Sequence, residues 1–204
     1  YIPRFVNLDA SSQQEDFVRG FGYQGGASRN KWQESIAEIG YGKSFKESIL
    51  KPGNWEIGMS GFGEMLPHPE NKVTLSATEK DQWGLPQLDF DVEFKTNERN
   101  MRKAIIEEAV SMLKKAGFKN VTPYENSTGP GLGIHEMGGA RMGSNPKTSV
   151  VDQNNSLHDV KNVFVTDGAF MTSASCVNPS LTYMAFTARA ANFAAQAFKN
   201  QNFS

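Results

Sequence analysis

Histidines are the side chains of this sequence best suited to acid–base chemistry, because imidazole changes charge near neutral pH. The chain has three, His68, His135 and His158, which are far apart and lack the i, i+4 pairing of a helical zinc site. We therefore expect no metal site. His68 stands between two prolines and His158 in a turn-rich segment, which predicts solvated loop histidines at both positions.

His135 has a different context, a stretch rich in glycine. Residues 133–143 read GIHEMGGARMG, and their glycines allow a backbone or a ligand to approach closely. His135 is therefore a candidate general base, although its spacing alone is equally compatible with a structural role.

Asn178 and Pro179 open the last predicted helix. Asn is a preferred N-cap and Pro a preferred first helical residue, which is a sufficient structural explanation for both. The same geometry could serve a function, because a helix N-terminus carries partial positive charge and stabilises an anion.

Asp167 and Gly168 follow a short apolar run, where an acidic residue either forms a turn or hydrogen-bonds a cofactor sugar. Cys176, the single cysteine, has no assigned base beside it, which favours a small buried side chain over a nucleophile.

The composition excludes several classes of protein. The 204 residues include 21 Lys plus Arg and 22 Asp plus Glu, and this balance argues against a nucleic-acid partner. No run of about 20 apolar residues is present, so no membrane span is expected. One cysteine rules out an internal disulfide and a cysteine-based metal site, and it leaves cytoplasm and periplasm both open.

The periodicity of the first 128 residues predicts an α+β fold, with an antiparallel sheet that carries helices on one face. Alternation of apolar and polar residues predicts half-buried strands around residues 55–60, 72–76 and 87–94. Spacings of three and four predict a helix over residues 28–39, capped by Ser28, and a longer amphipathic helix over residues 98–116.

The remaining residues change in character after a linker at 127–131. Residues 163–165 form a short apolar run, which predicts a buried strand of the parallel type. A final helix over residues 179–199 is apolar nearly all round, so we expect it to be buried on most sides.

Three blocks of this last part, in this order and with these separations, resemble the C-terminal region of the glucose/methanol/choline (GMC) flavin oxidoreductases. They are residues 133–143, residues 162–169 (NVFVTDGA) and residues 178–182 (NPSLT). Upstream, residues 63–67 (GEMLP) and the 98–116 helix are similar to the substrate domain of that family. The sequence of residues 135–143 (HEMGGARMG) is most similar to that of members that act on sugars, such as glucoside 3-dehydrogenases and pyranose oxidases.

The resemblance implies roles for individual residues. His135 matches the histidine of the family's active-site pair, and Asn178 matches its partner, which is His or Asn. Asp167 and Gly168 match a flavin-contacting motif. The backbone that faces the flavin pyrimidine ring matches the turn formed by Asn178, Pro179, Ser180, Leu181 and Thr182.

The resemblance also implies a division into two parts. Residues 1–128 correspond to the substrate domain, and residues 129–204 carry the active-site pair and return, through a strand and a helix, to the FAD-binding domain. The family binds the adenosine half of FAD through an N-terminal Gly-x-Gly-x-x-Gly turn between a strand and a helix, a strand-to-helix turn that we do not expect in this chain, and the chain begins at Tyr1. We therefore expect the C-terminal portion of a longer enzyme, inactive by itself and without FAD, whose partner is the N-terminal FAD-binding portion.

The implied reaction is oxidation of a CH–OH group of a sugar or another alcohol, with hydride passing to the flavin and His135 accepting the hydroxyl proton. Oxygen, a quinone and a cytochrome are all compatible as the electron acceptor. A second hypothesis, from another class, is a catalytically silent carbohydrate-binding or scaffolding domain of GMC-like shape.

Overall fold

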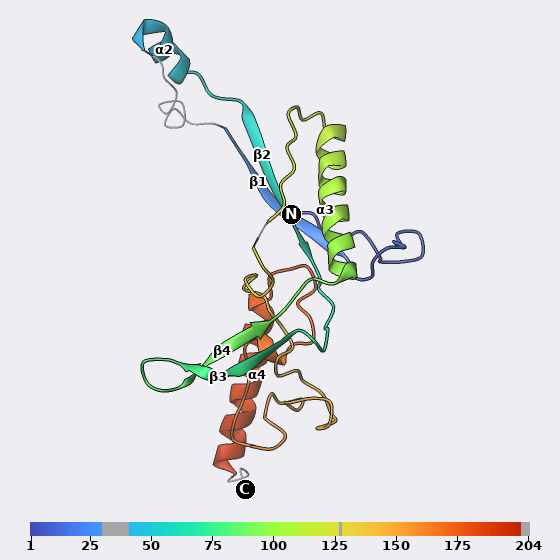
Figure 1. The fold of residues 1–204 in the computed structure, drawn as a ribbon, viewed down its shortest axis with the longest axis vertical. Helices are drawn as coiled ribbons and strands as arrows, with labels where there is room; N and C mark the ends of the chain where they lie inside the picture. Colours follow the sequence, from blue (N-terminus) through green and yellow to red (C-terminus); the bar gives the residue numbers. More distant parts are fainter. Residues whose placement is uncertain (30–40, 127, 201–204) are drawn as a thin grey trace.

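The computed structural model describes residues 1–29, 41–126 and 128–200. The molecule is elongated (Figure 1). A long β-ribbon with helix α3 beside it forms one half, and a β-hairpin, the loops after residue 128 and helix α4 form the other. The predicted α+β class is confirmed, since the described ranges contain two small antiparallel sheets and few helices.

The β-ribbon consists of β1 (Phe21–Arg29) and β2 (Trp55–Gly63), paired antiparallel from Phe21 opposite Gly63 to Arg29 opposite Trp55. The strand predicted from residue 55 is confirmed, but its predicted buried face is wrong at Trp55, which is 62% exposed. Helix α2 (Gly42–Ile49), which the sequence analysis missed, lies at the far end of the ribbon (Figure 1). The predicted cap at Ser28 is wrong because this residue is in β1, and the rest of that predicted helix lies outside the described residues.

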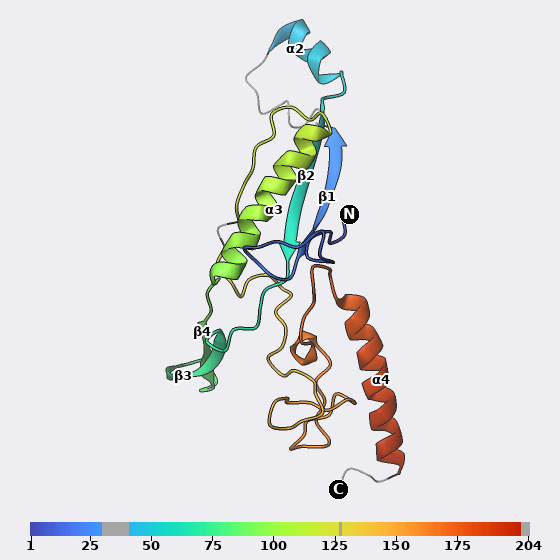
Figure 2. The ribbon, with the colours of Figure 1, turned by 90° about the vertical axis from the view of Figure 1, so that its right-hand side faces the viewer.

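Helix α3 (Thr96–Lys115) runs along one face of the ribbon, as Figure 2 shows. The predicted amphipathic helix is confirmed, because Met101 and its stripe pack against the buried rings of Phe21 and Tyr23. Two glycines of β2 allow this close approach. A Cβ at Gly61 would lie 2.2 Å from Ile105 Cγ2, and one at Gly63 would lie 2.5 Å from Met101 Sδ.

The second sheet pairs β3 (Lys72–Lys80) with β4 (Pro86–Asp91), again antiparallel. Val73 lies opposite Phe90 and Leu75 opposite Leu88, so the predicted alternation is confirmed. The predicted burial of this apolar face is wrong, since Phe90 is 63% exposed. A two-stranded hairpin buries such a face only against another layer, and no layer of the described chain covers it.

Two predictions for the last part of the chain, a buried strand and a buried helix, are also wrong. Residues 163–165 form no strand, and Phe164 stands in an isolated antiparallel bridge with Ser156. Helix α4 (Ser180–Lys199) is present, but among its residues only Ala190 and Ala197 are buried, and Leu181 is 79% exposed. A parallel strand and an apolar helix both require neighbouring elements. None of the helices in the described ranges is long and apolar enough to span a bilayer.

Candidate active site

His135 and Asn178, which are 43 residues apart, meet in the structure. The amide Nδ2 of Asn178 lies 3.1 Å from His135 Nε2. His135 is half-buried, follows Ile134 in left-handed backbone conformation (φ 67°), and stands in the glycine-rich stretch. Asn178 stands directly before the buried Pro179. The structure thus brings together the two residues that the resemblance pairs.

The sequence position of Asn178 predicts that it caps helix α4, but the structure shows that it does not. The N-cap is Pro179, which makes no side-chain cap hydrogen bond, and the carboxamide of Asn178 points instead toward two other side chains. One is His135, and the other is Gln24, whose Nε2 donates to Asn178 Oδ1. This use of the amide frees the first turn of α4 for other contacts.

Gln24 comes from β1 and is a site residue that sequence reasoning missed. Side chains alternate across a strand, and Tyr23 points into the α3 layer, where its hydroxyl donates to the Ile105 carbonyl at 2.7 Å. Gln24 therefore lies on the opposite face, beside its cross-strand partner Ser60. No spacing signal could have found this contact, because 154 residues separate Gln24 from Asn178.

The first turn of α4 presents backbone donors. The hydrogen bond from Tyr183 N–H to the Pro179 carbonyl is 3.1 Å, and the three N–H groups before it belong to the turn that has no intrahelical acceptor. This turn contains Ser180, Leu181 and Thr182. Such N–H groups, at the positive end of the helix dipole, suit a cofactor oxygen that gains negative charge.

Asp167 and Gly168 lie near the side chain of Tyr183, the residue that follows this turn. Asp167 Oδ1 accepts from Ala169 N–H at 3.0 Å and so begins the short 3₁₀ turn η1 (Gly168–Phe170). A Cβ at Gly168 would lie 2.7 Å from Met137 Sδ and 2.8 Å from the Tyr183 hydroxyl, so only glycine allows this packing. Burial, together with the Asp167 and Glu136 carboxylates, raises the pKa of Tyr183.

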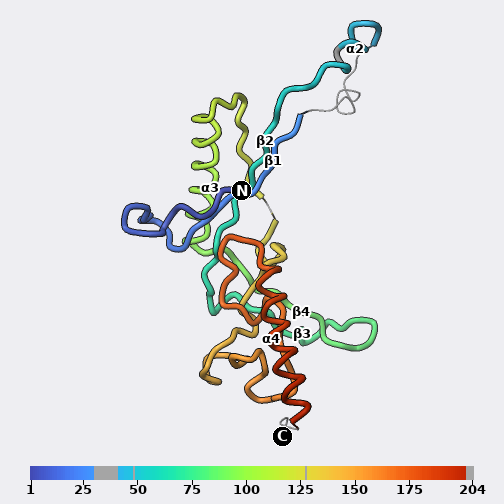
Figure 3. Tube along the Cα trace, turned by 180° about the vertical axis from the view of Figure 1, so that it is seen from behind, coloured from blue at the N-terminus to red at the C-terminus, as the bar shows by residue number. Residues whose placement is uncertain are grey.

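Backbone hydrogen bonds tie the glycine-rich stretch to η1. Ala140 N–H donates to the Ala169 carbonyl at 2.9 Å, and Met142 N–H donates to the Phe170 carbonyl at 2.8 Å. Every residue that the resemblance assigns to the active site or to the flavin therefore lies in one cluster of connected segments. The tube in Figure 3 shows these segments wound beside α4.

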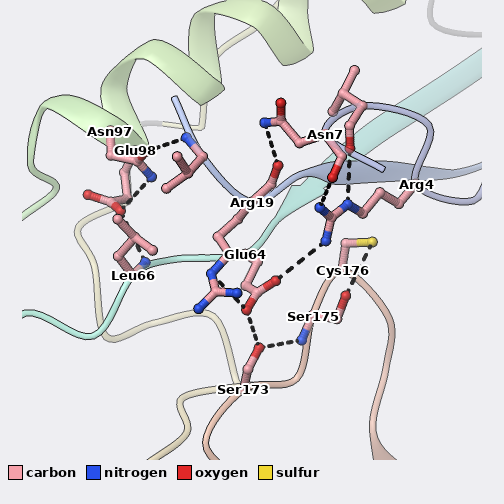
Figure 4. A network of polar contacts seen from close by, with 12 residues as sticks. Arg4, Asn7, Arg19, Glu64, Leu66, Asn97, Glu98, Ser173, Ser175 and Cys176 are labelled. Atoms are coloured by element: carbon pink, nitrogen blue, oxygen red, sulfur yellow. Dashed lines mark hydrogen bonds and ion pairs between the residues drawn. The ribbon is translucent and has the colours of Figure 1, made fainter. Parts of the chain in front are cut away.

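A buried carboxylate anchors the loop that leads to Asn178. Glu64, at the end of β2, is 9% exposed and accepts a 2.7 Å hydrogen bond from Ser173 Oγ (Figure 4). Arg4 and Arg19 lie 3.9 and 3.6 Å from its oxygens. Ser173 Oγ in turn accepts from Ser175 N–H at 2.8 Å, so the network fixes the loop three residues before Asn178.

We expect Ser173→Ala to lower the free energy of unfolding by about 1 kcal/mol, because one hydrogen bond to a carboxylate is lost while Glu64 keeps its arginines. Urea unfolding followed by circular dichroism measures this change. Ser44→Ala, on the exposed side of α2, is the matched control and should have little effect. If both variants lost the same free energy of unfolding, Ser173 would have no anchoring role.

The other candidate side chains are engaged elsewhere. The prediction of solvated histidines is wrong, since His68 Nε2 lies 3.1 Å from Glu98 Oε2 and His158 Nε2 lies 2.9 Å from Ser149 Oγ. These partners were not visible as sequence patterns. Cys176 is buried, as predicted. Within residues 1–29, 41–126 and 128–200, no group of three or more His, Cys, Asp or Glu side chains could hold a metal ion.

Comparison with known proteins gives one family. Residues 67–187, more than half of the chain, match the C-terminal model of the family described as GMC oxidoreductase. A 2-methyl-1,2-propanediol dehydrogenase of Mycolicibacterium austroafricanum is 32% identical over 208 residues, which cover 98% of this chain and 36% of that protein.

Two further relatives act on sugars by name. The fructose dehydrogenase large subunit of Gluconobacter japonicus is 29% identical over 189 residues, covering 90% of this chain and 34% of that protein. A pyranose 2-oxidase of Tricholoma matsutake is 25% identical over 144 residues, covering 66% of this chain and 26% of that protein. The chain thus spans about a third or less of the length of these relatives.

Proposed function

The chain belongs to the GMC oxidoreductase family, and on that basis we propose that it is the part of a longer FAD-dependent enzyme that oxidises a CH–OH group of a sugar or related alcohol. His135 is the general base and Asn178 is its partner. The observation that carries this proposal is the 3.1 Å contact between Asn178 Nδ2 and His135 Nε2, directly before the uncapped N-terminus of α4.

The proposed chemistry starts from the substrate hydroxyl. When FAD is bound, it supplies the acceptor for the hydride that leaves the substrate carbon. The C–H bond breaks with its electron pair, the C=O bond forms, and the hydroxyl proton passes to His135 Nε2. Asn178 Nδ2 donates a hydrogen bond to the same substrate oxygen, which stabilises the negative charge that develops there.

The residues of the cluster fit the isoalloxazine end of a flavin. GMC oxidoreductases are FAD-dependent, and the backbone N–H groups of the first turn of α4 suit the carbonyl oxygen of a flavin. Asp167 uses one carboxylate oxygen within its own turn, and its exposed side chain keeps the other available for a ribityl hydroxyl. We assign Asp167 and Gly168, together with Pro179, Ser180, Leu181 and Thr182, to the flavin contact.

The same reasoning supports a division of labour along the chain. The buried cluster of Phe21, Tyr23 and Met101 lies within residues 1–128, which we assign to the substrate domain. Residues 129–204 supply the active-site pair and the proposed flavin contacts, and we assign them to the segment that joins the FAD-binding portion. The exposed apolar side chains of α4 fit this assignment, because they require a covering element.

The cofactor gives a direct test. We expect the 204-residue chain, purified by itself, to be colourless or weakly yellow, because its Gly-x-Gly-x-x-Gly spacing, from Gly20 to Gly25, runs into strand β1 and forms no strand-to-helix turn for the FAD pyrophosphate. The full-length protein should contain FAD that sugars or vicinal diols bleach in rapid-mixing experiments. A full-stoichiometry flavin spectrum from the short chain would contradict the first expectation. A full-length protein without FAD would favour a silent carbohydrate-binding or scaffolding domain.

A further inference from the structure

The two ends of the Asn178 carboxamide have different partners. Its Oδ1 accepts from Gln24 Nε2, and its Nδ2 lies 3.1 Å from His135 Nε2. An amide nitrogen only donates, so the imidazole nitrogen that it meets must accept. The contact is therefore made by an unprotonated Nε2, which is the state that a general base requires.

The opposite orientation of this amide would not serve the reaction. If Asn178 turned by 180°, its Oδ1 would face His135, and an acceptor there pairs only with a protonated Nε2. With Gln24 oriented as in the structure, a turned amide would also place its NH₂ group against the NH₂ group of Gln24, donor against donor. Gln24 thus favours the orientation in which Asn178 donates toward the site.

We propose that Gln24 is a positioning residue of the active site, which holds the Asn178 carboxamide with its NH₂ group directed at His135 and at the substrate oxygen. This inference rests on the proposed function and adds to it a residue from the first strand of the chain. Gln24 acts on the rate of oxidation through Asn178, without itself accepting the proton.

Strand β1 gives Gln24 the rigidity that this role demands. The neighbouring Tyr23 is fully buried, with its hydroxyl bonded to the Ile105 carbonyl at 2.7 Å. The cross-strand partner Ser60 is bonded to the Tyr124 hydroxyl at 2.6 Å. Side chains on strands hold a site more accurately than side chains on loops, and Asn178 itself follows a loop.

Substitutions of Gln24 in the full-length, FAD-loaded enzyme test this proposal. We expect Gln24→Leu to lower the rate of flavin reduction by about 3- to 10-fold, the effect of one hydrogen bond, with a smaller change in substrate affinity. Gln24→Glu should cost more, although it is nearly isosteric, because a carboxylate repels Asn178 Oδ1 and favours the turned amide. Ser28→Ala, on the same face of β1, is the matched control and should leave the rate unchanged.

A double-mutant cycle separates positioning from packing. In an Asn178→Ala background, Gln24→Leu should change the reduction rate by less than about twofold, because the residue through which it acts is gone. Equal losses in both backgrounds, or a milder effect of Gln24→Glu than of Gln24→Leu, would overturn the role of Gln24 alone. Normal reduction in His135→Ala would instead overturn the proposed function, and with it this inference.

Discussion

His135→Ala is expected to lower the rate of flavin reduction by substrate by about 10²- to 10⁴-fold in the full-length enzyme, the usual contribution of a positioned general base. The physical reason is that a neutral alcohol is a poor hydride donor, and the hydroxyl proton then has no acceptor at the position of Nε2. The FAD content should survive, because His135 contacts Asn178 and lies outside the segments that we assign to the flavin. Rapid-mixing kinetics, monitored by flavin absorbance, measure the rate.

Two comparisons make this result specific. Added imidazole should restore part of the activity of His135→Ala, because a small base can occupy the space left by the ring. His158→Ala should retain the reduction rate, since His158 Nε2 binds Ser149 Oγ and the Gly143 carbonyl, eight residues along the chain from His135. Near-normal reduction in FAD-loaded His135→Ala would leave this histidine as a structural loop residue and require another base.

The sequence was sufficient to predict those features that local periodicity determines. The strands β2, β3 and β4 and the amphipathic stripe of α3 each arise within one segment, and the structure confirms these elements. The expected burial of α4 and of residues 163–165 requires neighbouring elements, and the described residues do not supply them. Periodicity identifies an apolar face but cannot show whether the chain itself supplies its cover.

The candidate site divides in the same way. The glycine-rich stretch around His135 and the Asn178 turn could be selected from the sequence, because glycine, asparagine and proline have strong backbone preferences. Gln24 and Glu64 could not be selected, since each acts on a segment more than a hundred residues away and neither lies in a distinctive motif. Ordinary polar residues on a strand gain such roles only from the tertiary fold.

Glu98 is expected to be the most costly single polar side chain of α3 to replace. It is 4% exposed, and its two carboxylate oxygens accept from Leu66 N–H, Lys95 N–H and Asn97 Nδ2, while His68 Nε2 lies 3.1 Å away. Glu98→Gln places an NH₂ group against some of these donors. We expect a loss of about 2–3 kcal/mol in the free energy of unfolding at pH 7, measured by urea unfolding.

The pH dependence of this loss follows from the state of Glu98. Burial acts to raise its pKa, but the hydrogen bonds from Leu66, Asn97 and His68 outweigh burial and lower the pKa below the ordinary 4.5. A carboxyl with a lowered pKa stabilises the fold above its unfolded-state pKa, and this contribution is lost as the pH falls through the folded-state value. The difference between wild type and Glu98→Gln should therefore be largest at neutral pH and shrink below pH 4.5.

A control on the same helix distinguishes this buried network from a general effect of charge. Glu107 is exposed and lies 3.9 Å from Lys103 in an i, i+4 pair, so Glu107→Gln should cost less than about 0.5 kcal/mol and show no comparable pH dependence. If both variants lost the same stability, net helix charge would explain the result. A large, acid-sensitive loss of stability in Glu98→Gln alone would show that this carboxylate fixes the start of α3 to the connection that follows β2. That connection begins at Glu64, which contacts the loop before Asn178 through Ser173.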